Sequence, residues 1–242
     1  MFTSILKPIH WRTAGLLTLL FLLTATGPRL RAQETGEDTW GAWYQYFGMN
    51  RISDRLSIHT EAQFRYYETL SNFNQMLLRT GLNYHINEKA IATLGYGYID
   101  TDPTYSDSED LLNDIKEHRI FEQFLLYNSV WEFRFEHRYR LEQRFLDFDG
   151  ISDTQHRARY RLQLTLPLTD TFFLNFYDEV FINLHDEPFD QNRIYSALGV
   201  LITENSSLQL GSMKNHFRRT NFDRLQVAFF YNPDLRGLFK NR

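Results

Sequence analysis

The stretch that decides the fold is residues 131–145, WEFRFEHRYRLEQRF. Every even-numbered position in it is Glu or Arg, and the odd-numbered positions are aromatic or apolar except His137 and Gln143. Successive side chains of a β-strand point to opposite faces, whereas a helix would scatter these charges around its circumference. The stretch therefore predicts a strand with one apolar face and one fully charged face.

The same alternation recurs along the chain. It is clear at 56–67, 76–86 and 155–166. Weaker runs lie at 40–49, 90–99, 116–127, 171–183, 192–203, 208–216 and 224–232. The alternation is least clear at 116–127, where two polar residues, Glu122 and Gln123, are adjacent. These runs predict about eleven strands and an all-β protein.

The predicted connections alternate between short and long. The short ones are 50–54, 87–89, 128–129, 167–170 and 204–207, and the long ones are 68–74, 100–115, 146–154, 185–191 and 217–223. Regular alternation places all short turns at one end of an up-and-down sheet, as in outer-membrane barrels. The sequence thus predicts a single antiparallel up-and-down transmembrane β-barrel. Since single-chain bacterial barrels have even strand numbers, we expect about 12 strands, or alternatively 10. A twelfth would lie in 33–40 or 233–242.

Energy sets the direction of the two faces. An Arg that faces lipid costs roughly 2–4 kcal/mol at the bilayer midplane, so exposing the arginines of 131–145 and 155–166 would cost on the order of 10 kcal/mol. The residues expected to line the lumen are Glu61, Arg65, Glu132, Arg134, Glu136, Arg138, Arg140, Glu142, Arg144, Arg157, Arg159 and Arg161. Those expected to face lipid are Leu56, Ile58, Phe64, Leu78, Leu82, Trp131, Phe133, Phe135, Tyr139, Leu141, Tyr160, Leu162 and Leu164.

The N-terminal segment predicts export. Residues 1–32 carry Lys7, His10 and Arg12 before the apolar core 14–26, which is short for a membrane span and typical of a signal peptide. A retained N-terminal anchor is the alternative. The expected mature barrel is 33–242. Four of the 26 Lys and Arg lie in residues 1–32 and all 30 acidic residues lie after them, so the net charge of residues 33–242 is −8. This acidic balance does not indicate a nucleic-acid partner.

Four segments together resemble a known family. They are EHRIFEQ at 117–123, FRFEHRYRLEQR at 133–144, NFYDEVF at 175–181 and FDQNRIY at 189–195. In this order they resemble a family of small Gram-negative outer-membrane β-barrel proteins classed as a domain of unknown function. The resemblance covers residues 38–235. It implies a barrel in the outer membrane and no particular activity.

The function predicted from the sequence is non-enzymatic: a structural barrel or a narrow, porin-like diffusion channel with an Arg/Glu-lined lumen. No cofactor and no metal are expected, because no zinc-ligand spacing occurs and the acidic loop 100–114 lacks the spaced ligands of a calcium loop. Expected partners are outer-membrane lipid, lipopolysaccharide and the barrel-assembly machinery. The first alternative is an outer-membrane enzyme of the lipase or acyltransferase type, although no nucleophile-elbow motif is present. The second is a soluble periplasmic barrel that binds a ligand.

Overall fold

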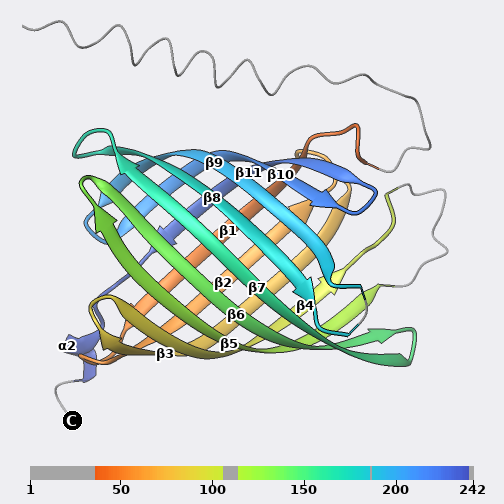
Figure 1. Ribbon diagram of the computed structural model, residues 1–242, viewed down its shortest axis with the longest axis horizontal. Coiled ribbons are helices and arrows are strands. Elements are labelled where there is room, and N and C mark those ends of the chain that lie inside the picture. Colours follow the sequence, from red (N-terminus) through yellow and green to blue (C-terminus); the bar gives the residue numbers. More distant parts are fainter. Residues whose placement is uncertain (1–35, 106–113, 186, 240–242) are drawn as a thin grey trace, which may run out of the picture. The chain divides into compact units, whose positions relative to one another are not determined.

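The computed structural model describes residues 36–105, 114–185 and 187–239, which form one closed barrel (Figure 1). Its elements are β1(Gly41–Arg51), β2(Leu56–Tyr66), β3(Phe73–Asn87), β4(Ala90–Thr101), β5(Ile115–Val130), β6(Phe133–Phe148), β7(Ile151–Pro167), β8(Phe172–Asn183), β9(Phe189–Thr203), β10(Ser206–Phe217), β11(Asn221–Tyr231) and the short helix α2(Arg236–Phe239). In this part of the chain no helix has the length and hydropathy needed to cross a membrane. The predicted signal peptide and residues 106–113 of the acidic loop lie outside the described ranges.

The barrel closes by a parallel strand pair. Each strand from β1 to β11 is antiparallel to the next, and β1 then pairs with β11 in parallel, from Gly41↔Arg224 to Gly48↔Tyr231. The predicted all-β barrel of about twelve strands is confirmed, with eleven strands among the described residues. The expectation of purely antiparallel pairing is corrected, because an odd number of strands gives the first and last strand the same direction. Residues 36–40 hold a turn, and residues 236–239 hold α2.

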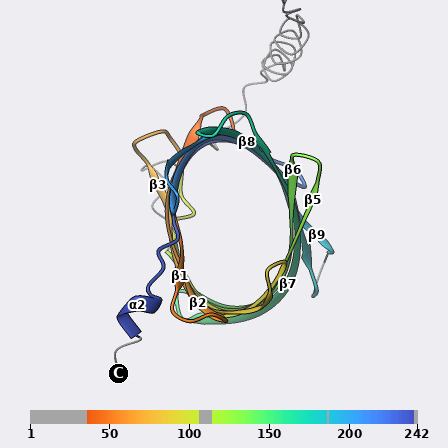
Figure 2. The same ribbon diagram turned by 90° about the vertical axis from the view of Figure 1, so that its left-hand side faces the viewer.

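The wall of the barrel has an apolar outside and a charged inside. On β6, Tyr139 and Leu141 are 47% and 50% exposed, whereas Arg140 and Glu142 between and beside them are 3% and 1% exposed. Figure 2 views the strands as a closed ring with α2 outside it. An outward apolar band around a polar interior is the arrangement of barrels that stand in lipid. Glu122 is an outward exception, and it accepts a hydrogen bond from Gln143 Nε2 (3.1 Å).

Three connections differ from their prediction. The expected long connection 217–223 is wrong, because only residues 218–220 join β10 to β11. β6 and β7 continue to a two-residue turn at Asp149 and Gly150, whose φ angles of 52° and 83° suit a tight hairpin turn, so the expected long connection 146–154 is wrong. Trp131 has a φ of 54° and lies with Glu132 in the turn between β5 and β6. These two residues are therefore outside the strand in which the alternation placed them, because a strand cannot continue through the positive-φ turn.

The C-terminal segment is fastened to the end of the barrel that carries the short turns. The backbone of Asp234 forms an isolated parallel β-bridge with that of Arg51 on β1. The Arg236 side chain donates to Asp54 (2.6 Å) in the β1–β2 turn and to Asp234 (2.6 Å). The hydrogen bonds from Arg236 lower the pKa of Asp234 to about 2. The chain after β11 is thus held at the short-turn end.

Candidate functional site in the barrel lumen

The carboxylate of Glu142 lies in the middle of the lumen and is surrounded by arginines. The Glu142 side chain has no exposed surface, and it lies among five arginines. Arg157 Nη2 and Arg159 Nη1 each donate to it at 2.7 Å, and Arg119 Nη1 donates at 3.4 Å. Arg140 and Arg79 complete the set, with nitrogens 3.7 and 4.0 Å from Oε1. Because a buried carboxylate keeps its charge only beside compensating groups, this cluster is a mutually dependent unit.

The ion pairs reach across the lumen as well as along the wall. Arg79 on β3 donates to Glu61 on the neighbouring β2 (2.8 Å). It also lies near Glu142 on β6, although β4 and β5 stand between β3 and β6 in the wall. On the other side, Arg159 Nη2 donates to Glu179 on β8 (2.7 Å). We call Glu61, Arg79, Arg119, Arg140, Glu142, Arg159 and Glu179 the charge layer. It spans the lumen from β2 to β8.

The remaining part of the lumen at this level is filled by an aromatic cluster. Trp43, Tyr195 and Met213 are buried together, and Tyr177 packs against them with its ring 4.6 Å from that of Tyr195. Tyr177 Oη donates to Met213 Sδ at 3.6 Å. Side chains from β1 and β8 to β10 therefore occupy the region that the charge layer leaves.

Glycine on the inner wall makes room for this filling. Gly95 of β4 faces the lumen, and a Cβ there would lie 2.2 Å from the Phe121 ring. Phe121 is fully buried, and the Arg140 guanidinium stacks over it with Cζ 4.8 Å from the ring centroid. A glycine on one strand thus lets an aromatic ring from the next strand support a residue of the charge layer.

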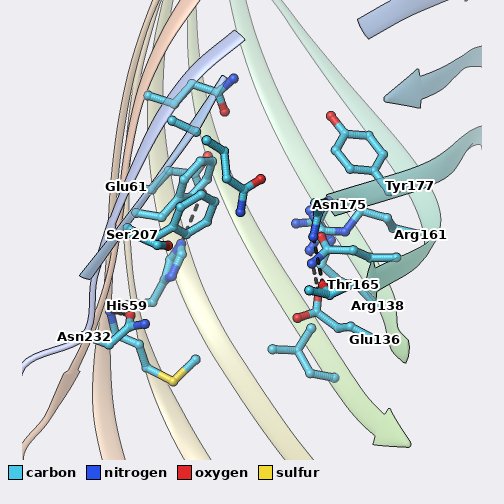
Figure 3. A pocket seen from close by; sticks show the side chains of 18 of the residues that line it. His59, Glu61, Glu136, Arg138, Arg161, Thr165, Asn175, Tyr177, Ser207 and Asn232 are labelled. Atoms are coloured by element: carbon cyan, nitrogen blue, oxygen red, sulfur yellow. Dashed lines mark hydrogen bonds and ion pairs between the residues drawn. The ribbon is translucent and has the colours of Figure 1, made fainter. Parts of the chain in front are cut away.

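The filling divides the lumen into two cavities. The turn-side cavity, about 340 Å³, opens toward the short turns, and the loop-side cavity, about 320 Å³, opens toward the longer loops. The two share no lining residue. Figure 3 shows the turn-side cavity, with His59 and Glu61 on one wall and Glu136, Arg138 and Arg161 on the other.

Charges in the turn-side cavity are paired. Arg161 donates to Glu136, Arg138 Nη2 donates to Glu179 (2.7 Å), and the His59 ring lies 3.1 Å from Glu61. The loop-side cavity differs, because its lining holds eight arginines and one carboxylate, Glu117. Within the described ranges no group of three or more His, Asp or Glu could hold a metal ion.

The structure places most of the predicted lumen residues inside the barrel. Glu61, Arg65, Arg140, Glu142, Arg157 and Arg159 are buried, and Glu136, Arg138, Arg144 and Arg161 are partly buried at the cavities. Glu132 and Arg134 are exposed at the end of the barrel. Outward and exposed lie Ile58, Phe64, Leu78, Leu82, Tyr139, Leu141, Tyr160 and Leu162, with Leu56, Phe133, Phe135 and Leu164 partly covered. Trp131 is 89% exposed in its turn. Contact of these residues with lipid stays a prediction.

Several residues of the site were not among the predicted ones: Trp43, Arg79, Glu117, Arg119, Glu179, Arg193 and Arg224. Glu117 and Arg119 occupy inward positions of β5, where the outward Glu122 obscured the alternation. Arg79 stands on the polar face of the 76–86 alternation, so that pattern alone could have identified it. Glu179 shares the inward face of β8 with aromatic residues, so the sequence shows no separation of polar and apolar faces on this strand.

A search of solved structures finds a barrel of low similarity. LpxR from Salmonella typhimurium matches with a TM-score of 0.44 and 10% sequence identity, over 76% of this chain and 85% of that chain. LpxR is an outer-membrane lipid A deacylase. This neighbour contradicts the expectation of a non-enzymatic barrel, and at this similarity it assigns no activity to the chain.

The sequence comparisons identify the family. No curated protein matches significantly. The family described as "Protein of unknown function (DUF2490)" matches residues 40–226, which includes β1 to β10 and all seven residues of the charge layer. The chain therefore belongs to the DUF2490 family.

Proposed function

We propose that the protein is an outer-membrane β-barrel of a Gram-negative bacterium whose lumen is closed to solutes, exported by means of residues 1–32 as a signal peptide. The observation that carries this proposal is the fully buried Glu142 with its five arginines, which stands between two cavities without a common lining residue. The apolar outer wall supports the membrane location, with lipid and lipopolysaccharide as its surroundings and the barrel-assembly machinery as its insertion partner.

Closure follows from the strength of the packing around Glu142. Hydrogen bonds between charged groups are about twice as strong as neutral ones, and several share the same acceptor here. An ion that passed would have to part Arg159 from both Glu142 and Glu179, to which it donates at 2.7 Å. Separating a buried pair leaves uncompensated charge, so the layer is a barrier rather than a selectivity filter.

Planar-bilayer recording tests the closure. We expect the wild-type protein, shown to be folded by its heat-modifiable migration in gels, to give no discrete conductance steps. Arg140 lines the turn-side cavity and Arg159 the loop-side cavity, so the double variant R140A/R159A joins the two and is expected to conduct. Discrete steps from the wild type, or silence of the folded double variant, would contradict the proposal.

A second candidate function, hydrolysis of a membrane lipid ester, is favoured by one cluster on the outer wall. His137 Nδ1 lies 2.9 Å from Tyr160 Oη, and its Nε2 lies 3.0 Å from Asn128 Oδ1. The amide oxygen fixes the proton on Nε2, so Nδ1 can accept the Tyr160 proton. A hydroxyl, a base and an orienting group in this order form the arrangement of an activated nucleophile.

Lipid hydrolysis is tested with a matched pair of histidine variants. His118 also faces outward and lies 2.5 Å from a tyrosine hydroxyl, that of Tyr96, but its ring makes no hydrogen bond to an amide among the described residues. If the candidate function is correct, the wild type releases fatty acid from phospholipid vesicles, H137A lowers the rate roughly 100-fold or more and H118A leaves it unchanged. An inactive wild type, or equal loss in both variants, removes this candidate.

A further inference from the structure

Three arginines of the loop-side cavity have no carboxylate partner. Arg65, Arg193 and Arg224 form no ion pair with any residue of the described ranges, although other arginines of this lining do. Arg65 donates to the amide oxygens of Gln63 and Gln75, and Arg193 donates to that of Gln191. These neutral amides accept some of the hydrogen bonds that the arginines can donate, but they do not compensate the positive charge of the arginines.

The first two of these arginines share one aromatic ring. Arg65 Cζ lies 3.7 Å and Arg193 Cζ 4.9 Å from the centroid of Trp43. The indole ring stabilises each cation, but it holds the two positive charges close together. Trp43 is 6% exposed, and its Nε1 donor has no partner in the described part of the chain. A buried N–H without an acceptor, beside two cations that form no ion pair with the described residues, is an arrangement that a bound anion would complete.

The third arginine extends the positive surface. Arg224 on β11 stacks over Phe222 with Cζ 4.5 Å from the ring centroid, and only its Nη1 has a partner, the Asp223 carbonyl (3.2 Å). Its side chain lies across Gly41 of the neighbouring β1, where a Cβ would come 2.7 Å from Arg224 Cδ. Any larger residue at position 41 would displace it. The wall is therefore shaped to hold this guanidinium inside the cavity, with its remaining donors available.

From these contacts we infer that the loop-side cavity binds a phosphate-type oxyanion, held by Arg65, Arg193 and Arg224 with Trp43 beside it. Guanidinium groups present forked donors that match phosphate oxygens in two-point hydrogen bonds. A cavity of about 320 Å³ accommodates inorganic phosphate or a small soluble phosphate ester. The ligand enters from the end with the longer loops, because the charge layer closes the other side. This site does not depend on the hydrolysis candidate, which lies on the outer wall.

Titration with inorganic phosphate tests the site, using the folded full chain in detergent at constant ionic strength. We expect saturable quenching or enhancement of tryptophan emission in a W40F/W131F background, in which Trp43 is the only tryptophan left in the described ranges. We also expect a rise in the unfolding temperature with phosphate concentration, because a ligand that binds only the folded state stabilises it. Chloride at equal ionic strength is expected to do neither. Glycerol phosphate distinguishes a soluble ester from free phosphate as the preferred ligand.

Arginine-to-glutamine variants decide whether the named residues bind the anion. R193Q and R224Q are each expected to weaken phosphate binding about tenfold or more, whereas R55Q, at an exposed arginine in the β1–β2 turn, leaves it unchanged. Without phosphate, R193Q is expected to unfold at no lower temperature than the wild type, because it removes a repulsive charge. This separates binding from a structural role. A response that does not saturate, equal responses to chloride, or unchanged affinity in R193Q and R224Q would overturn the inference.

Discussion

The variant E142Q is expected to lower the free energy of unfolding by about 3–5 kcal/mol, the usual cost of removing one partner from a buried ion pair. Glu142 compensates arginines from β3, β5, β6 and β7, and its side chain has no exposed surface. Gln keeps the shape but removes the charge, so the arginines remain buried with too little negative charge. Urea unfolding in lipid vesicles measures the loss as a lower midpoint with an unchanged slope.

Glu122 supplies the matched control for this prediction. It lies on the neighbouring strand, directly beside Leu141, but it faces outward and is exposed. E122Q makes the same chemical change on the other face of the wall and is expected to leave stability within about 0.5 kcal/mol of the wild type or to raise it, as a charge leaves the apolar surface. Equal effects of E142Q and E122Q would show that the charge layer does not stabilise the barrel.

Placing an arginine on the outer wall is expected to have the second large effect. Leu141 lies near the middle of β6, faces outward and is 50% exposed. L141R is expected to cost roughly 2–4 kcal/mol, because a charge at the bilayer midplane loses its water without gaining a partner. The measurement is again urea unfolding in vesicles, together with the yield of folded protein in gels.

Leu168 is the matched position for that substitution. It is also 50% exposed, but it lies in the turn between β7 and β8. L168R is expected to cost less than about 1 kcal/mol, because the penalty falls toward the interface. If L141R and L168R were equally stable, Leu141 would lie in water and the barrel would not stand in lipid.

The sequence predicts the barrel and, for the strands with the clearest alternation, which side chains face inward and which face outward. Alternation is a local property of each strand, so the burial of Arg140 and Glu142 between the exposed Tyr139 and Leu141 follows from position alone. The alternation is also weak where both faces of a strand carry similar residues. On β8 the inward side has Phe173, Tyr177 and Phe181 beside Glu179, and aromatic residues occur outward as well.

The parts that could not be predicted depend on contacts between strands far apart in the ring. The approach of Arg79 to Glu142 and the stacking of both Arg65 and Arg193 on Trp43 depend on the curvature of the closed barrel, which no single segment encodes. The strand number depends on how β1 meets β11. The sequence does contain a signal for the tight turn at Asp149 and Gly150, because Asp-Gly is typical of a two-residue hairpin turn, and the predicted long connection 146–154 overlooks it.

The assignment of the two faces is tested most directly by labelling single cysteines, which the natural chain lacks. A fluorophore on L141C, on the outer wall, is expected to be quenched by brominated lipid and not by aqueous iodide. One on S207C, at the turn-side cavity, is expected to show the reverse. Quenching of the S207C label by lipid and of the L141C label by iodide would contradict a barrel with an apolar outside and a charged interior.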